Sequence, residues 1–374
     1  MKTLFVHIGT PKTGTTSIQH LLCRNRSVLE KQGYCYPDFS DLYPGYSTSV
    51  NGRFLVQAVP QKDGVDSIKE EQRLYREGME RVIALFTVYD HVILSNEAIF
   101  RATYKRRSNL WQQLLEEGER YGFAVKVIVF LRRQDLFAAS LYNQNVKVNT
   151  RTHCAGLTKT WEQYMKPPYP KERSYDYYGR LESIRAVLGR DAIIVRRFDK
   201  KYFYRGSLQA EFLHVVGLEY TDEYQQKLSE INQSLPGNTL EIMRLLNEIE
   251  ILDEEERVFF RQALYQDAEL SSRYYKTCVF SKEDTKKFLA QYEEGNRRIA
   301  EEYIKDGEPL FDDTIAELPK YERRNEYMID DAIRFTALCT RMLMQENYKL
   351  RKEYEQLKNK MMHPAKTIWS KLRS

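Results

Sequence analysis

The chain has 374 residues, 42% of them hydrophobic and 30% charged, a composition that allows a large α/β domain with an additional part. No run approaches the eighteen or so apolar residues of a membrane span, and a strand predicted directly after Met1 leaves no room for a signal peptide. The cysteines are widely spaced and form no C-x-x-C pair, which excludes a disulfide framework or a zinc site and predicts reduced thiols in a cytoplasmic protein.

The net charge of +5 is concentrated at the end of the chain. Residues 358–374 contain five basic side chains and no acidic one, so the remaining chain is balanced at 53 basic and 53 acidic residues. A balanced surface argues against nucleic acid as a partner and indicates a basic tail with its own role.

The chain begins with a strand-like run. Residues 3–8 are rich in β-branched and aromatic types and predict a short buried strand. A turn from Gly9 to Gly14 contains Lys12, and apolar residues at helical spacing then predict a helix over about 15–32. A strand, a Gly-Lys turn and a helix in this order direct backbone N–H groups and the positive helix end at an anion. The sequence therefore predicts a phosphate or sulfate cradle.

The elements that follow alternate between the two types. Further strands are predicted at 91–95, 124–131 and 192–195, between helices at 66–88, 108–121, 134–148 and 174–188. This alternation predicts an α/β fold, a P-loop-like parallel β-sheet flanked by helices. A Tyr- and Gly-rich stretch, 34–52, predicts a loop near the site. Beyond about residue 206 the patterns predict a helical C-terminal half, with helices at 207–217, 238–249, 253–267, 282–305 and 321–361.

The position of the lysine indicates which anion the turn binds. In the loop of nucleotide triphosphatases the lysine follows the second glycine, whereas here Thr15 stands at that position and Lys12 precedes Gly14. The turn resembles instead the 5′-phosphosulfate-binding loop of sulfotransferases that use 3′-phosphoadenosine 5′-phosphosulfate (PAPS), in particular bacterial, carbohydrate sulfotransferase-like proteins. The residues that carry this resemblance are Pro11, Lys12, Thr13, Gly14, Thr15, Thr16 and Ser17. A P-loop kinase or nucleotide-binding protein, and a catalytically silent protein that binds adenosine 3′,5′-bisphosphate (PAP), remain the alternatives.

A second motif follows the strand at 124–131. Arg132 lies at its carboxyl end, and Ser140 lies about two helical turns later on the next helix. Arginine and serine both suit phosphate, and the run resembles the 3′-phosphate-binding signature of sulfotransferases, with Gln134 where proline is common. A solvated helix start is the alternative. In this family a basic, glycine-containing loop after the last core strand completes the site, and here the candidates are Lys200, Lys201, Arg205 and Gly206.

Sulfuryl transfer requires positioning and charge neutralisation more than covalent catalysis. Lys12 is predicted to stabilise the leaving phosphate oxygen. No metal is expected, because the sulfuryl group of the donor carries one negative charge fewer than a γ-phosphate, and the lack of a strand that ends in a Walker-B-like aspartate agrees with this. Glu97 follows the strand at 91–95 and is predicted to be the general base for an acceptor hydroxyl. Alternatively, the Glu97 carboxylate only stabilises the start of a helix, and His7 or His153 is the general base.

The resemblance implies that the acceptor is a carbohydrate, on a surface polysaccharide or a lipid-linked glycan. Aromatic side chains in the predicted loops suit sugar stacking and equally suit ordinary packing: Tyr34, Tyr36, Tyr43, Tyr46, Trp161 and Tyr164. The resemblance extends weakly to about residue 311. It predicts a sulfotransferase domain over 1–311, with an α/β core of about 1–218 and a helical continuation over 219–311, followed by an extension over 312–374.

The extension contains two further patterns. Apolar residues repeat every three and four positions, with one asparagine among them: Leu343, Asn347, Leu350, Tyr354, Leu357 and Met361. Because this seam covers under three heptads, a homodimeric coiled coil and a helix laid against the body both remain open. After Pro364, basic residues flank an apolar face with Trp369, which suits either peripheral contact with the inner face of the membrane or a disordered end.

Overall fold

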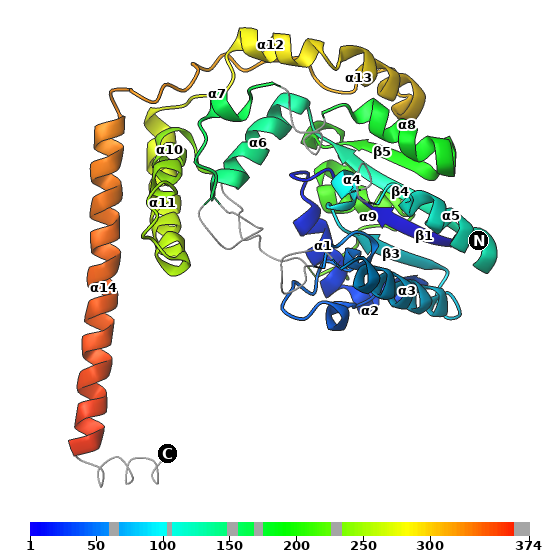
Figure 1. Cartoon of the computed structure of the whole chain (residues 1–374), viewed down its shortest axis with the longest axis horizontal. Coiled ribbons are helices and arrows are strands. Elements are labelled where there is room, and N and C mark those ends of the chain that lie inside the picture. Colours follow the sequence, from blue (N-terminus) through cyan, green and yellow to red (C-terminus); the bar gives the residue numbers. More distant parts are fainter. Residues whose placement is uncertain (60–66, 103–106, 148–155, 168–174, 226–233, 363–374) are drawn as a thin grey trace. The chain divides into compact units, whose positions relative to one another are not determined.

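The computed structural model describes residues 1–59, 67–102, 107–147, 156–167, 175–225 and 234–362 (Figure 1). The chain folds into two compact units, and both are assembled from separate stretches of sequence. The first comprises Met1–Leu141, Lys166–Ile231 and Glu283–Ala316, and the second comprises Tyr142–Met165, Asn232–Lys282 and Glu317–Ser374. These units are interleaved along the chain, whereas the division at residue 311 is linear and stays a prediction about the extent of the family domain.

The first unit is built on a five-stranded sheet in which every neighbouring pair is parallel (Figure 1). The strand order is β2-β3-β1-β4-β5, which places β1 at the centre. In this register His7, at the end of β1, lies beside Ser95 and Ile128, and Leu131 lies beside Arg197. The carboxyl ends of the strands therefore share one edge of the sheet. The strands are β1 (Lys2–His7), β2 (Tyr34–Cys35), β3 (His91–Ser95), β4 (Phe123–Leu131) and β5 (Ile193–Arg197).

Both faces of the sheet are covered. Phe5 and Ile93 on one face pack in a core with Ile18 of α1 and Phe212 of α9. The intervening residues on the other face, such as Val6, are equally buried, because successive side chains in a strand point to opposite faces. These observations confirm the predicted α/β fold. The helices of this unit are α1 (Thr15–Arg24), α2 (Arg26–Lys31), α3 (Ile68–Leu85), α4 (Ile99–Ala102), α5 (Leu110–Tyr121), α8 (Tyr177–Leu188), α9 (Leu208–Val215), α12 (Lys282–Ala290) and α13 (Glu293–Ile299).

In the part of the second unit that the structure describes, helices are the main secondary structure. Helix α6 (Gln134–Lys147) begins in the first unit and ends in the second. Helix α10 packs against α11 and α14, and an isolated β-bridge joins Cys278 to Lys320. The predicted helical C-terminal half is therefore confirmed. Its helices are α7 (Trp161–Tyr164), α10 (Gly237–Leu246), α11 (Glu254–Tyr274) and α14 (Met328–Met362). None of the described helices combines the length and the apolarity needed to cross a bilayer.

Three predicted elements differ from the structure in detail. The helix expected over 15–32 is two helices, because the chain leaves helical geometry at Asn25, whose side chain donates a hydrogen bond to the Leu21 carbonyl (2.8 Å). The stretch 34–52 was expected to be irregular, yet its first residues form β2 at the edge of the sheet. The helix expected over 282–305 is divided into α12, α13 and a π-helical turn at Ala300–Ile304.

Candidate active site

The loop between β1 and α1 has an unusual backbone. Gly9 and Gly14 have positive φ angles of 88° and 71°, which glycine adopts without steric cost. Lys12 also has a positive φ, 68°, and for a residue with a side chain this conformation costs on the order of 1–2 kcal/mol. A methyl group added to Gly14 would lie 2.3 Å from Leu208 Cδ2, and one added to Gly9 would lie 3.1 Å from Glu97 Cβ. The loop is therefore packed tightly between neighbouring segments, which hold Lys12 in a strained conformation.

The start of α1 retains polar groups that a ligand can use. Gly14 is the N-cap residue and, having no side chain, makes no side-chain cap hydrogen bond to the first N–H groups of this helix. The hydroxyl of Thr15 is buried and has no hydrogen-bond partner among the residues that the structure describes. Thr13 is buried as well, but its hydroxyl donates to the Thr10 carbonyl (2.5 Å) and so supports the turn. A helix start without a side-chain cap and with a buried hydroxyl beside it fits an anionic ligand such as the phosphosulfate.

The structure brings Lys12, Arg132 and Glu97 together. Arg132 Nη1 donates a hydrogen bond to the Lys12 carbonyl (3.2 Å). Burial and the neighbouring positive charge of Arg132 lower the pKa of Lys12, while the charge of Glu97 raises it. Burial also lowers the pKa of Arg132. Two half-buried cations next to each other destabilise one another, and a bound anion would relieve that repulsion.

Glu97 is held by a chain of buried polar contacts. Gln19 Nε2 donates to Glu97 Oε2 (3.3 Å) and to Ser95 Oγ (3.2 Å), and His7 Nδ1 lies 2.9 Å from the same Ser95 hydroxyl. Burial lowers the pKa of His7 to about 3, so the imidazole is neutral near pH 7. His7 is fully buried and its Nε2 has no hydrogen-bond partner within the described part of the chain, whereas Glu97 is half-buried. This geometry fits Glu97 as the group that meets a substrate and His7 as its support.

Sequence reasoning missed Arg53, which also faces Glu97. Burial lowers the pKa of Arg53, and the charge of Glu97 raises it. The guanidinium lies 4.7 Å from the centre of the Tyr46 ring, and its Nε is buried without a hydrogen-bond partner in the ranges that the structure describes. The preceding Asn51 fixes this segment at the end of β3, because its amide accepts from the Ser95 N–H (2.8 Å). The sequence predicted that residues 34–52 form a loop near the site, but Arg53 lies just beyond this stretch and belongs to no motif that would identify it.

The segment after β5 reaches the β1–α1 loop. Gln209 Nε2 donates to Ser17 Oγ (2.9 Å), and Leu208 packs against Gly14. Arg205 and Gly206 precede this contact with consecutive positive φ angles of 52° and 68°. Arg205 is exposed and forms an ion pair with Glu219 (3.1 Å).

The remaining predicted site residues have varied positions. Ser140 is half-buried on α6, and both Lys200 and Lys201 are exposed. Thr16 is also exposed, at the first turn of α1. His153 lies outside the described residues. The roles assigned to these residues, and to Pro11 in the loop, stay predictions.

Most of the aromatic residues proposed for sugar stacking are buried in packing contacts. Tyr34, Tyr36 and Tyr43 are at most 7% exposed, and the phenols of Tyr34 and Tyr36 donate to the carbonyls of Val216 (2.7 Å) and Ser49 (2.5 Å). Trp161 and Tyr164 are buried as well. Ordinary packing therefore explains five of the six residues. Tyr46 differs, because its ring is 48% exposed.

Comparison with known proteins gives limited matches. No protein-family model matches the chain. Over 179 residues the chain is 30% identical to an uncharacterized protein of Archaeoglobus fulgidus, a match that covers 48% of this chain and 46% of that protein. The chain thus spans about half the length of the curated relative it matches. A crystal structure of a sulfotransferase from Alicyclobacillus acidocaldarius aligns with 62% of this chain and 87% of its own, with 16% identity and a TM-score of 0.32. The functional assignment therefore depends on the residues of the site.

Proposed function

We propose that the protein is a sulfotransferase that moves a sulfuryl group from PAPS to an acceptor hydroxyl. The observation that carries this proposal is the strained Lys12, held in the β1–α1 loop by a hydrogen bond from Arg132 to its carbonyl. Two half-buried cations at the start of a helix favour a ligand with concentrated negative charge. The placement of Lys12 before Gly14 favours phosphosulfate over the triphosphate of a kinase substrate.

Different residues of the site would bind different groups of PAPS. The N–H groups at the start of α1 and the unpaired Thr15 hydroxyl suit the 5′-phosphate oxygens. The Lys12 ammonium would neutralise the oxygen that bridges phosphorus and sulfur as that S–O bond breaks. Arg132 and Ser140, with Arg205 and Gly206 after β5, would bind the 3′-phosphate, as the family resemblance implies.

Glu97 would act on the acceptor. The acceptor oxygen forms the new bond to sulfur, its proton passes to the Glu97 carboxylate, and PAP leaves with the electrons of the broken S–O bond. Gln19 donates a hydrogen bond to this carboxylate, and the positive charge of Arg53 interacts with it electrostatically. A carbohydrate hydroxyl remains the proposed acceptor; the exposed Tyr46 ring beside Arg53 supports it, because an aromatic face with a nearby cation suits a sugar.

The proposal is tested by transfer of label from PAPS labelled in its sulfuryl group. The protein is incubated with a panel of neutral and anionic oligosaccharides, without added metal, and labelled products are separated by chromatography. The expected result is labelled saccharide from the wild type and none from Lys12→Ala. Label transferred equally by both proteins, or phosphate transfer from ATP·Mg²⁺ with no sulfuryl transfer to any acceptor, would overturn the assignment.

A further inference from the structure

Helix α14 has two faces with different environments. We letter the heptads of α14 so that Asn347 occupies position a, and the a and d positions then form the seam. The residues that contact α11 lie on the opposite side of the helix. Phe335, at position c, lies 6.0 Å from the ring of Phe260, and Met342, also at c, accepts from Gln266 Nε2 (3.9 Å). Both partners belong to α11. The a/d face of α14 therefore points away from the helix on which it packs.

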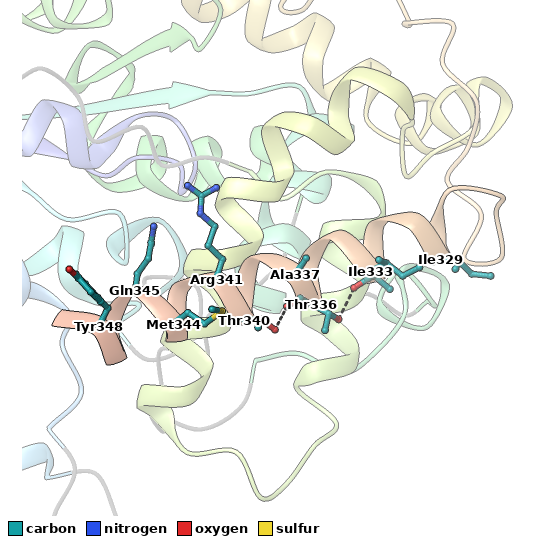
Figure 2. Close-up of a pocket in the computed structure, with 10 residues that line it drawn as sticks. Ile329, Ile333, Thr336, Ala337, Thr340, Arg341, Met344, Gln345 and Tyr348 are labelled. Carbon is teal, nitrogen blue, oxygen red and sulfur yellow. Dashed lines mark hydrogen bonds between the residues drawn. The ribbon is translucent and has the colours of Figure 1, made fainter. Parts of the chain in front are cut away.

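The exposed seam is longer than the sequence pattern suggested. Four positions continue it toward the N-terminus in the same heptad register, namely Ile329, Ile333, Thr336 and Thr340, and all four are exposed. They line a groove along α14 (Figure 2), with Ala337 and Met344 beside them at e positions, and beyond Thr340 the groove turns off the seam toward Arg341, Gln345 and Tyr348 at b and f positions. The apolar a and d residues from Leu343 to Met361 are between 55% and 82% exposed. With these positions the seam runs over four heptads, which meets the length that a coiled coil needs.

The polar residues of the seam fit burial between two helices. The hydroxyls of Thr336 and Thr340 donate to the carbonyls of Ala332 (2.8 Å) and Thr336 (2.9 Å), so covering them would leave no donor unsatisfied (Figure 2). Asn347 occupies one a position among apolar neighbours. An asparagine there pairs with its counterpart on a second helix only when the two helices are in register, and this favours a dimer over larger assemblies.

The charges that flank the seam favour two parallel copies of this helix. In a parallel coiled coil, position g of one helix faces position e of the next heptad on the other helix. Glu346 would thus face the partner's Arg351, and Glu353 would face the partner's Lys358, so both pairs have opposite charges. In an antiparallel pair e would face e and g would face g, which brings these acidic residues together and these basic residues together.

We propose that the protein forms a parallel, in-register homodimer through the seam of α14, from Ile329 to Met361. The occupant of the exposed seam is a second copy of this chain, because the g and e charges complement themselves in parallel register and Asn347 specifies two strands. This proposal is independent of the chemistry at the sheet edge.

The first test measures the mass of the full-length protein by sedimentation across a concentration series. The wild type should sediment as a dimer, and the double variant Leu350→Asp/Leu357→Asp should raise the dimer dissociation constant by about 100-fold or more. Both leucines are 58% exposed within the chain, so these changes should leave the helix folded. Asn359→Asp is the matched control: it places an added negative charge at an exposed f position, outside both the seam and the groove, and should leave the dimer intact.

The second test determines orientation. Glu346→Lys/Glu353→Lys and Arg351→Glu/Lys358→Glu should each lose self-association, and mixing the two variants should restore a dimer. Mild oxidation of Asn347→Cys should link two chains, whereas Asn359→Cys, at an exposed f position, should add no cross-link beyond that of the wild type. A wild type that is monomeric or trimeric, a dimer unaffected by the leucine substitutions, or charge variants that fail to complement would each overturn the proposal.

Discussion

Two segments at the carboxyl edge of the sheet share their local chemistry but differ in their surroundings. Each contains a basic residue with a left-handed backbone near a glycine: Lys12 in the β1–α1 loop and Arg205 after β5, with φ angles of 68° and 52°. Lys12 is half-buried with a second cation, Arg132, at its carbonyl. Arg205 is exposed and already paired with Glu219.

This difference indicates which segment carries the function. A cation that is buried beside another cation is destabilised until an anion binds, so the free energy of binding at Lys12 is large. An exposed ion pair contributes about 0–1 kcal/mol, and losing it changes little. The β1–α1 loop should therefore dominate catalysis, and the segment after β5 should only adjust cosubstrate affinity.

The largest effect is expected at Lys12. Replacing it with glycine removes the charge that stabilises the leaving oxygen, and turnover should fall by at least about 10³-fold. The same change relieves the left-handed strain and should raise the free energy of unfolding by about 1 kcal/mol. Lys12→Ala, which keeps the strain, should lose turnover without that gain. Turnover is measured with labelled PAPS and stability by denaturant titration, and an unchanged rate in both variants would remove Lys12 from the mechanism.

Glu97→Gln should lower the rate of transfer by about 10²–10⁴-fold, because the amide cannot accept the acceptor's proton. Binding of PAP should stay close to that of the wild type. The measurement is single-turnover transfer with saturating PAPS. A loss of only two- or threefold would make Glu97 a structural carboxylate, and the base would then be sought at His7 or His153.

Arg132→Ala should weaken PAP binding by about 1.5–3 kcal/mol, and Ser140→Ala by less, as expected for a charged contact and a hydroxyl contact. The loss at Ser140 should be specific to nucleotides that carry a 3′-phosphate. Adenosine 5′-phosphosulfate, which lacks that group, is the control ligand. Equal losses for both ligands in both variants would show that neither residue recognises the 3′-phosphate.

The affinity for PAP should fall at alkaline pH, because Lys12 binds the anion only while protonated and its pKa is lowered by burial and by Arg132. Removing the positive charge of Arg132 raises the pKa of Lys12, so in Arg132→Ala the loss of affinity at alkaline pH (the alkaline limb) should move to higher pH. Removing the charge of Glu97, which raises the pKa of Lys12, should move the limb to lower pH in Glu97→Gln. Calorimetric titrations across pH measure both shifts, and limbs that stay fixed would exclude Lys12 as the titrating group.

The smallest effect is expected at Arg205. Arg205→Ala should weaken PAP binding only a few-fold, about the strength of an exposed ionic contact. Glu219→Gln releases Arg205 from its present partner and should strengthen binding slightly if the arginine reaches the 3′-phosphate. If Arg205→Ala lost as much affinity for PAP as Arg132→Ala, the proposed difference between the two segments would be wrong.

Sequence patterns predicted the parts of the fold that depend on periodicity. The long strands and the helices between them follow from runs of apolar residues, and the meeting of Lys12, Arg132 and Glu97 follows from their positions after parallel strands. Strand β2 was missed because two residues carry no periodicity.

Burial was harder to predict than secondary structure. From the sequence, Tyr34 and Tyr36 suited sugar stacking and ordinary packing equally. In the fold they are packed, and their hydroxyls donate to the carbonyls of Val216 and Ser49. Arg53 was missed for the same reason, since its approach to Glu97 depends on how Asn51 docks on β3. These contacts depend on tertiary structure, and a single sequence without a motif does not specify them.

The most direct test of the central claim is calorimetric titration of the wild-type protein with PAP in the presence of a chelator. Binding of PAP without metal, tighter than that of ATP·Mg²⁺ measured separately with magnesium and reduced in Lys12→Ala, is the result that a PAPS-dependent site at the β1–α1 loop predicts. Failure to bind PAP while ATP·Mg²⁺ binds, or PAP binding unchanged by loss of Lys12 and Arg132, would contradict it.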